Sequence, residues 1–360
     1  MKDIKKHFPA SQEHVYLNTA SCGLLSETLV KWRHQNDLNL MQGGSIFRDT
    51  HKTHIKEIRQ DVAQFFGTTP DTVALIPNFS FGMNALIDSL PVNSKVLLLS
   101  GDYPSVNWPF EFREFDICYT EIDAYLEQNI ETAIAQHQPD IFAFSMVQYI
   151  SGIAMDLPFL KKLKRDHPEL LLIGDGTQFL GTTKFDFATS GVDVLAGSCY
   201  KWMLSGYGNG VALVQPEAQQ KLRPKTVGFN SADAAFSKRD SLAFIGRLEP
   251  GHQDTMNFGS LGESVRFMTR LGQKEVENHL NQLSIRAKEA FEALGLLDDM
   301  VVKRTSHSTI FNLKGDEVLF QKLKENNIIC SLRGNGIRVS FHIYNTITEL
   351  EFLISVLKNE

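Results

Sequence analysis

Apolar segments of strand length alternate with amphipathic segments of helix length from about residue 70 to residue 215. Such alternation favours a mostly parallel sheet that is covered by helices on both faces. The predicted fold class is therefore α/β. The helices are expected at 81–89, 125–136 and 157–166, and the strands at 73–76, 95–99, 117–121, 141–145, 170–173, 192–196 and 210–214.

The pattern changes after about residue 260. Residues 260–294 carry apolar side chains at helical spacing and predict one long helix. A chain of 360 residues exceeds one ordinary core, so we expect a large domain over 15–255 and a smaller α+β domain made of 1–14 and 256–360. In the smaller domain we predict short strands at 300–305, 309–313, 328–332 and 336–340, followed by a closing helix at 347–358.

The composition of the chain limits which binding partners and which cellular location we expect. The chain is 42% hydrophobic and 22% charged, which is typical of a globular protein, and its net charge of −6 argues against nucleic acid or an anionic membrane as a partner. The four cysteines lack metal-ligand spacing, so we expect reduced thiols and no metal site. The sequence shows neither a signal peptide nor an apolar run of membrane length, which predicts a cytoplasmic protein.

A lysine and an aspartate follow two of the predicted strands. Lys201 ends the turn Gly197-Ser-Cys-Tyr-Lys, and Asp175 lies in Gly174-Asp-Gly-Thr-Gln. Ligands of open α/β sheets bind at the carboxyl ends of the strands, so we expect both side chains in one crevice. A lysine there can form a Schiff base with a carbonyl cofactor, and a carboxylate can pair with a pyridinium nitrogen. The alternative is an ordinary surface lysine at the end of a strand.

Five motifs follow one another along the chain: Tyr16-Leu-Asn-Thr-Ala, Asp175-Gly-x-Gln, Ser198-x-Tyr-Lys, Gly206-x-Gly and Arg338-Val-Ser-Phe-His-Ile-Tyr-Asn-Thr. In this order they resemble the motifs of class V aminotransferases, which are fold-type I enzymes that use pyridoxal 5′-phosphate (PLP). The family includes cysteine desulfurases and isopenicillin-N-epimerase-like proteins. The resemblance implies the PLP-dependent transferase fold and a homodimer that shares its active sites.

The resemblance assigns roles around the cofactor. Lys201 would hold PLP as the internal aldimine and move protons at the substrate Cα, and Asp175 would keep the pyridine nitrogen protonated. Gln178 would hydrogen-bond the phenolic oxygen of the cofactor, and Tyr103 would stack on its ring. Outside the family, Gln178 would be a loop amide and Tyr103 a half-buried tyrosine. Two residues match the region near the phenolic oxygen, and the sequence does not choose between them: Gln148 and Tyr149.

Other residues match the family's phosphate site. Ser80 and the Phe81 amide follow a predicted strand and open a helix, and Ser198 and Tyr200 flank the lysine turn. Phe81 lacks the hydroxyl that the family usually has at this position, and Tyr200 stands where a histidine is more frequent. Thr255 resembles the threonine that reaches the phosphate of the other subunit. Ser80 and Thr255 are equally well read as helix caps.

The resemblance also implies a site for an amino acid substrate. Arg338 would bind the α-carboxylate, with Arg333 as a weaker candidate, and Asn18 and Thr19 would fold over the substrate. The alternative for Arg338 is an exposed arginine on a short strand.

The reaction that we favour is transamination at the Cα of an amino acid; a cysteine-independent lyase or an epimerase stays open. A desulfurase is disfavoured, because the turn at 333–338 contains no cysteine and Cys330 lies in an apolar strand. A non-catalytic binding module with a PLP fold would predict damage at Lys201, Asp175 or Arg338, and all three are intact. A nucleotide-binding enzyme would need a glycine-rich turn after its first strand, whereas the glycine-rich turn of this chain, at Gly206, comes after Lys201.

Overall fold

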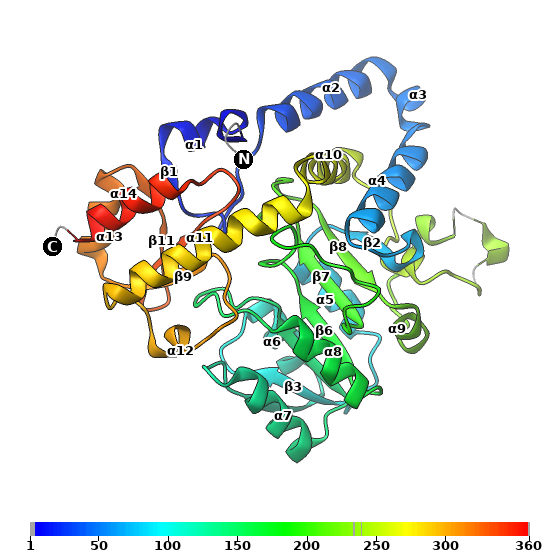
Figure 1. Ribbon diagram of the computed structural model, residues 1–360. Helices are drawn as coiled ribbons and strands as arrows, with labels where there is room; N and C mark the ends of the chain where they lie inside the picture. Colours follow the sequence, from blue (N-terminus) through cyan, green and yellow to red (C-terminus); the bar gives the residue numbers. More distant parts are fainter. Residues whose placement is uncertain (1–3, 233–234, 239, 359–360) are drawn as a thin grey trace.

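The computed structural model describes residues 4–232, 235–238 and 240–358. Within these residues the largest sheet has the strand order β2-β8-β7-β6-β5-β3-β4 (Figure 1). The neighbours from β7 through β4 pair in parallel, whereas β8 is antiparallel to β2 and β7. The predicted α/β class with a mostly parallel sheet is confirmed. The strands are β2 (Val73–Ile76), β3 (Lys95–Leu99), β4 (Asp116–Thr120), β5 (Ile141–Ser145), β6 (Leu171–Asp175), β7 (Val194–Ser198) and β8 (Gly210–Val214).

Both faces of this sheet are apolar, because successive residues of a strand point to opposite sides. In β3, for example, Leu97 and Leu99 join one hydrophobic cluster and Val96 and Leu98 join the other. The first cluster is covered by α4 (His51–Phe65), α7 (Leu126–His137), α8 (Leu157–Asp166) and α10 (Thr255–Leu271). The second is covered by α5 (Phe79–Ile87), α6 (Pro104–Glu111) and α9 (Pro216–Lys221).

The C-terminal part of the chain forms a separate sheet, in the order β11-β12-β9, with helices beside it (Figure 1). Both strand pairs are antiparallel. Its elements are α11 (Gln273–Ala293), α12 (Asp299–Val302), β9 (Ile310–Lys314), α13 (Glu317–Glu325), β10 (Ile328–Ile329), β11 (Ser331–Arg333), β12 (Gly336–Ser340) and α14 (Ile347–Lys358).

Three predictions for this part are wrong in detail. The single helix expected over 260–294 is two helices, because Gly272 adopts a φ of 83° between α10 and α11. The strand expected at 300–305 is the short helix α12, whose first turn is capped by the Asp298 carboxylate, which accepts a hydrogen bond from the Met300 N–H. The strand expected at 328–332 is divided between β10 and β11, which belong to different sheets.

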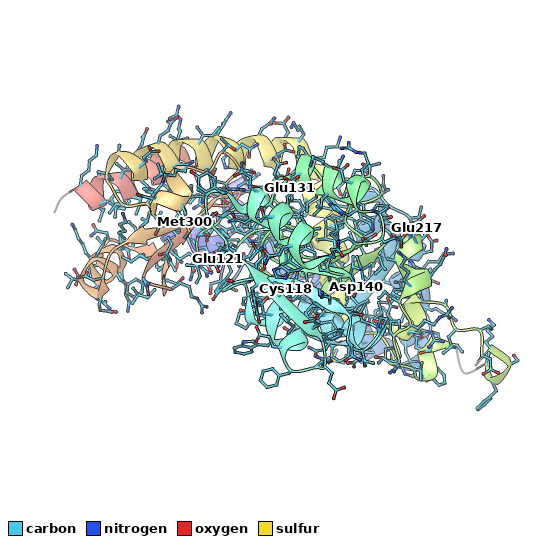
Figure 2. All side chains as sticks on the ribbon, turned by 90° about the horizontal axis from the view of Figure 1, so that it is seen from below. Cys118, Glu121, Glu131, Asp140, Glu217 and Met300 are labelled. Atoms are coloured by element: carbon cyan, nitrogen blue, oxygen red, sulfur yellow. The ribbon has the colours of Figure 1, made fainter. Side chains whose placement is uncertain are left out.

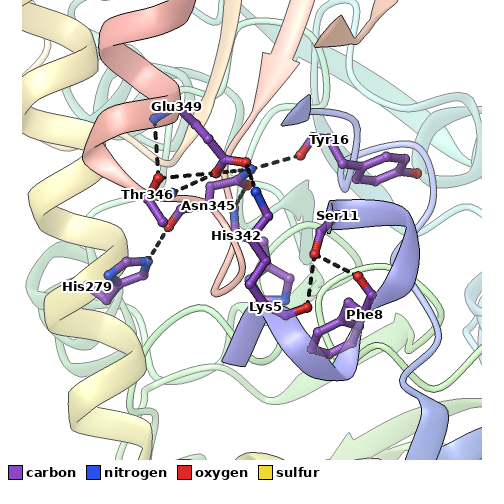
Figure 3. Close-up of polar contacts among 9 residues, drawn as sticks. All are labelled: Lys5, Phe8, Ser11, Tyr16, His279, His342, Asn345, Thr346 and Glu349. Atoms are coloured by element: carbon purple, nitrogen blue, oxygen red, sulfur yellow. Dashed lines mark hydrogen bonds and ion pairs between the residues drawn. The ribbon is translucent and has the colours of Figure 1, made fainter. Parts of the chain in front are cut away.

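The N-terminal segment packs against this C-terminal part (Figure 3). Strand β1 (Val15–Tyr16) pairs in parallel with β10. Lys5 Nζ donates to Glu349 Oε1 at 2.7 Å, and Asn345 Nδ2 donates to the Tyr16 carbonyl at 3.0 Å. The segment therefore links the start of the chain to α14. The division into domains at 15–255 and at 1–14 with 256–360 stays a prediction.

Further helices precede the large sheet: α1 (Pro9–Glu13), α2 (Glu27–Gly43) and α3 (Ser45–Arg48). Ser26 caps α2, because its side chain accepts a hydrogen bond from the Leu29 N–H. Among the residues that the structure describes, no helix has the length and apolar character needed to cross a membrane.

Candidate active site

Lys201 lies in a tightly packed turn directly after β7. The residue is 7% exposed, and its Nζ lies 5.9 Å from the ring centroid of Tyr103 and 5.6 Å from that of Tyr200. The ring of Tyr200 stacks in turn on Tyr207, with centroids 4.4 Å apart. The Gly23 N–H donates to the Tyr200 carbonyl at 3.1 Å, and a Cβ at position 23 would lie 2.0 Å from the Lys201 carbonyl oxygen. Lys201 is therefore a buried lysine, and the surface alternative is wrong.

Asp175 is the last residue of β6, which pairs with β7. Its Oδ1 accepts a hydrogen bond from the Thr177 N–H at 2.8 Å. Burial raises the pKa of Asp175 to about 6, against the hydrogen bonds from Thr177 and the charge of Lys201. Burial also lowers the pKa of Lys201 to about 8, against the charge of Asp175. At neutral pH a larger fraction of this lysine is neutral than of an exposed one.

The carboxyl end of β3 adds a buried carboxylate, Asp102, which the sequence analysis missed. Its Oδ1 accepts from the Tyr103 N–H at 2.7 Å and its Oδ2 from the Ser145 N–H at 2.8 Å. Ser145 ends β5, the strand between β3 and β6, and is the strand partner of Asp175, so the two carboxylates lie on either side of the end of β5. Burial raises the pKa of Asp102, and its charge contributes to the raised pKa of Asp175. The available signal was an acidic residue after a predicted strand, the pattern that selected Asp175.

The segment after β5 supplies Tyr149 to the same place. The ring of Tyr149 meets the ring of Tyr103 edge to face, with centroids 5.2 Å apart. Gln148 is used within its own turn: its Oε1 accepts from the N–H groups of Ile150 at 2.7 Å and Ser151 at 2.6 Å. The structure thus brings Tyr149 to the tyrosine beside Lys201, whereas the Gln148 oxygen closes the turn.

Arg338 lies on β12 and is 2% exposed, so the exposed alternative is wrong. Its Nη1 donates to the Tyr149 carbonyl at 2.7 Å, while Nε and Nη2 are buried without a hydrogen-bond partner among the described residues. Burial lowers the pKa of Arg338 to about 10, and the charge of Arg333 adds to the effect. Unpaired donors on a buried cation are costly, and a carboxylate matches a guanidinium in geometry and charge. The two donors are therefore available for an acidic ligand.

Asn18 and Thr19 lie where the N-terminal segment meets β12. Asn18 forms a parallel bridge with Ser340, and the Ala20 N–H donates to Ser340 Oγ at 2.9 Å. The Thr19 hydroxyl hydrogen-bonds the Tyr344 hydroxyl. The Oδ1 of Asn18 is buried and has no partner in the described part of the chain. The segment is thus held to the strand that carries Arg338.

Gln178 connects this segment to the lysine turn. Its Nε2 donates to the Ala20 carbonyl at 3.0 Å, and its Oε1 accepts from Trp202 Nε1 at 2.7 Å. His342 Nε2 donates to the Trp202 carbonyl at 2.9 Å, and burial lowers the pKa of His342 to about 3, so this histidine is neutral. The contact of Gln178 with a cofactor oxygen stays a prediction, since its amide already holds Trp202 beside Lys201.

Three of the predicted phosphate residues lie at the first turn of α5: Ser80, Phe81 and Ser198. Ser198 Oγ accepts from the Phe79 N–H at 2.9 Å and so joins the end of β7 to this turn. Asn78 caps the helix by accepting from the Phe81 N–H at 2.9 Å, and the Phe81 side chain is exposed. The Ser80 hydroxyl donates to a serine of α6 at 2.8 Å. A helix N-terminus with two hydroxyls beside it suits an anion.

Thr255 lies elsewhere in the chain. It is the first residue of α10, and its Oγ1 lies 3.4 Å from the ring nitrogens of His51. It lines a cavity of about 620 Å³ together with Arg48 and Arg59, and Lys201 is not among the lining residues. Across residues 4–232, 235–238 and 240–358, no three His, Cys, Asp or Glu side chains are grouped to hold a metal ion.

Comparison with known proteins identifies the family. The family described as "Aminotransferase class-V" matches residues 18–353, which is nearly the whole chain. The chain belongs to the class-V aminotransferase family. An uncharacterized aminotransferase of Bacillus subtilis, YcbU, is 24% identical over 98% of this chain and 96% of its own. Isopenicillin N epimerase of Amycolatopsis lactamdurans is 23% identical over 83% of each chain.

Solved structures share the fold of this chain. The apo structure of a cysteine desulfurase from Thermococcus onnurineus NA1 superposes with a TM-score of 0.85, covering 99% of this chain and 97% of the other, at 19% identity. The predicted fold of PLP-dependent transferases is therefore confirmed for this class-V chain. At this identity the likeness does not extend to the reaction.

The thiols of this class-V protein are poorly placed for sulfur transfer. Burial raises the pKa of both Cys199 and Cys330 to about 12, and it raises the pKa of Cys118 on the edge strand β4 (Figure 2). Cys22 lies next to Gly23 at the lysine turn, but its carbonyl accepts from the Tyr16 hydroxyl at 2.8 Å and its N–H donates to Asn18 at 3.0 Å. The Cys22 thiol is thus on a segment held by backbone hydrogen bonds rather than on a mobile loop.

Proposed function

We propose that this protein is a PLP-dependent aminotransferase that acts at the Cα of an amino acid. The observation that carries the proposal is the pair of unpaired donors on buried Arg338, near enough to Lys201 for its charge to act on that lysine together with the charge of Asp175. Arg338 can bind an α-carboxylate, and Lys201, a buried amine with a lowered pKa, can react near an α-amino group, so the pair suits an amino acid substrate.

The residues of the crevice fit PLP, the cofactor of the family. Lys201 would hold its aldehyde carbon, Asp175 its pyridine nitrogen, and Tyr103 would lie against its ring. The first turn of α5 with Ser198 would bind its phosphate. When bound, the cofactor supplies an electron sink for the Cα of the substrate.

The side chains of the protein would divide the remaining work. Arg338 binds the α-carboxylate through Nε and Nη2, while the Tyr149 carbonyl fixes the orientation of the guanidinium. Lys201 moves the proton at the substrate Cα, and its pKa near 8 suits transfer in both directions at neutral pH. The segment at Asn18 is tied both to β12, which carries Arg338, and through Ala20 to Gln178, so it would hold these two parts of the site together.

Transamination is favoured over the other reactions of the family. YcbU, named as an aminotransferase, aligns with almost the entire chain, and the placement of the thiols disfavours a desulfurase. An epimerase is the second candidate, because isopenicillin N epimerase covers 83% of this chain at nearly the same identity. Both reactions begin with loss of the Cα proton, so Lys201 and Arg338 serve either.

Single-turnover measurements distinguish the reactions. The cofactor-loaded protein is mixed with one amino acid at a time, without a 2-oxo acid acceptor. We expect one amino acid to yield one equivalent of its 2-oxo acid per site, after which product formation stops. Continued turnover to an inverted amino acid, or to a cleaved side chain, would contradict transamination and assign an epimerase or a lyase.

We also propose a cytoplasmic homodimer that shares its active sites. Thr255 supports this, because it lines a cavity with Arg48 and Arg59 away from the lysine of its own chain. The exposed rings of Phe81 and Phe229 offer apolar area for such a contact. Sedimentation of the cofactor-loaded protein measures its mass, and a monomer at micromolar concentration would contradict the shared site.

Asp102→Asn tests how the crevice is supported. Asparagine leaves one of the two backbone N–H groups without an acceptor, which costs about 1–3 kcal/mol in free energy of unfolding. Because the Tyr103 ring loses its fixed position, we expect the dissociation constant of PLP to rise about tenfold. Asp193→Asn is the control: Asp193 is also buried and accepts from the Leu172 N–H, but it precedes β7. An equal loss of PLP affinity in both variants would contradict the role of Asp102.

A further inference from the structure

Arg333 lies on the same face of the small sheet as Arg338. In the β11–β12 hairpin, Arg338 is opposite Ser331 and Arg333 is opposite Gly336. Residues that are directly opposite share a face, and so does every second residue along a strand. The two arginines are therefore diagonal neighbours, a pairing whose separation is roughly 7–8 Å and somewhat less between the Cβ atoms.

This face is turned toward the crevice. Arg338 donates a hydrogen bond to the Tyr149 carbonyl. The turn beside Arg333 packs against Ile150, the residue after Tyr149, since a Cβ at Gly334 would lie 3.0 Å from Ile150 Cγ2. The same segment presents the Tyr149 ring to Tyr103. The positive charge of Arg333 also contributes to the lowered pKa of both Lys201 and Arg338.

The backbone of Arg333 is fixed, whereas its guanidinium is available. Its carbonyl accepts from Asn312 Nδ2 at 2.7 Å, and Gly334 holds the turn with a φ of 59°. Its side chain is exposed and forms no ion pair within the described residues. The partly buried Arg59, in contrast, is paired with Glu249 at 2.7 Å. The hairpin thus carries a buried cation, Arg338, and an exposed one, Arg333, neither matched by a carboxylate from the described chain.

We propose that the substrate is an amino acid whose side chain ends in a second carboxylate. Arg338 binds the α-carboxylate, and Arg333 binds the distal one where the side chain leaves the crevice. This assignment rests on the proposed function and adds the substrate class. It makes Arg333 a specificity-determining residue, because an amide in place of the distal acid leaves the cation unmatched.

A binding experiment tests the proposal independently of turnover. The cofactor-loaded protein is titrated by calorimetry with succinate, glutarate and butyrate, which have two, two and one carboxylates. We expect a dicarboxylate to bind more tightly than butyrate, and Arg333→Gln to weaken that binding about tenfold while butyrate binding stays unchanged. Arg165→Gln, at an exposed arginine of α8, is the control for loss of one positive charge. An equal loss for butyrate would show a general field effect and overturn the proposal.

Kinetics give the second readout. We expect kcat/KM for aspartate or glutamate to exceed kcat/KM for the corresponding amide, asparagine or glutamine. Arg333→Gln should reduce the ratio of acid to amide kcat/KM about tenfold and leave kcat/KM for the amides unchanged. A neutral amino acid as the best donor, or a ratio that Arg333→Gln leaves unaltered, would overturn the substrate class and leave the proposed function intact. Failure of every amino acid to yield a 2-oxo acid would instead reject transamination.

Discussion

Lys201→Ala should lower amino acid turnover by more than about a thousandfold and abolish the visible absorption of covalently held PLP. The variant loses both the amine that holds the cofactor and the base at the substrate Cα, and a positioned acid–base group alone contributes about 10²–10⁴-fold. Folding should be preserved, because burial already disfavours the lysine charge and lowers its pKa to about 8. Absorption spectra and turnover of the purified variant measure both effects.

Lys164→Ala is the matched control for this experiment. Lys164 pairs with Asp193 at 2.8 Å at the amino end of β7, so its loss affects stability without touching the crevice. The control should keep the absorption band and most of the activity. Full turnover by Lys201→Ala, with the band retained, would remove the lysine from the mechanism.

Arg338→Gln should lower kcat/KM for the amino acid substrate roughly a hundredfold or more. Truncating one partner of a buried charged pair costs about 2–5 kcal/mol, and the two unpaired donors make Arg338 the partner of the α-carboxylate. Steady-state kinetics with a saturating 2-oxo acid measure this loss. PLP affinity should change little, because the guanidinium is assigned to the substrate rather than to the cofactor.

The thermal stability of Arg338→Gln separates this role from a structural one. Nε and Nη2 carry a desolvation cost without hydrogen bonds in the substrate-free protein, so the variant should melt at the same temperature or higher. Arg304→Gln should behave in the opposite way. Arg304 is also buried, but it is paired with Glu127 at 2.7 Å, so its replacement leaves an unmatched acid and lowers the melting temperature. A large stability loss in Arg338→Gln would contradict the substrate assignment.

The large sheet was predictable because burial on both faces leaves a strong local signal. Each strand from Val73 to Val214 was placed within two residues, and all of them except the edge strand β4 are short apolar runs. The C-terminal part was harder, because its elements depend on long-range pairing. The apolar run at 328–332 reads as one strand, yet β10 pairs with β1, more than 300 residues earlier, and β11 pairs with β12.

The site residues that lie at or just after the ends of strands of the large sheet could be predicted from the sequence. Asp175 and Lys201 follow strands that are neighbours in the sheet, so a sequence rule places them together. The roles of Gln148 and Gln178 were less accessible, because one amide is used by its own turn and the other by Trp202. Local sequence does not encode such competition for hydrogen bonds.

The most direct test of the account locates the cofactor on the chain. The cofactor-loaded protein is reduced with borohydride, digested and mapped by mass spectrometry. We expect the pyridoxyl phosphate mass on the peptide that contains Lys201, with no modification of Lys164 or of the Lys201→Ala variant. Attachment to another lysine, or no attachment in protein that binds PLP tightly, would contradict the central role of Lys201.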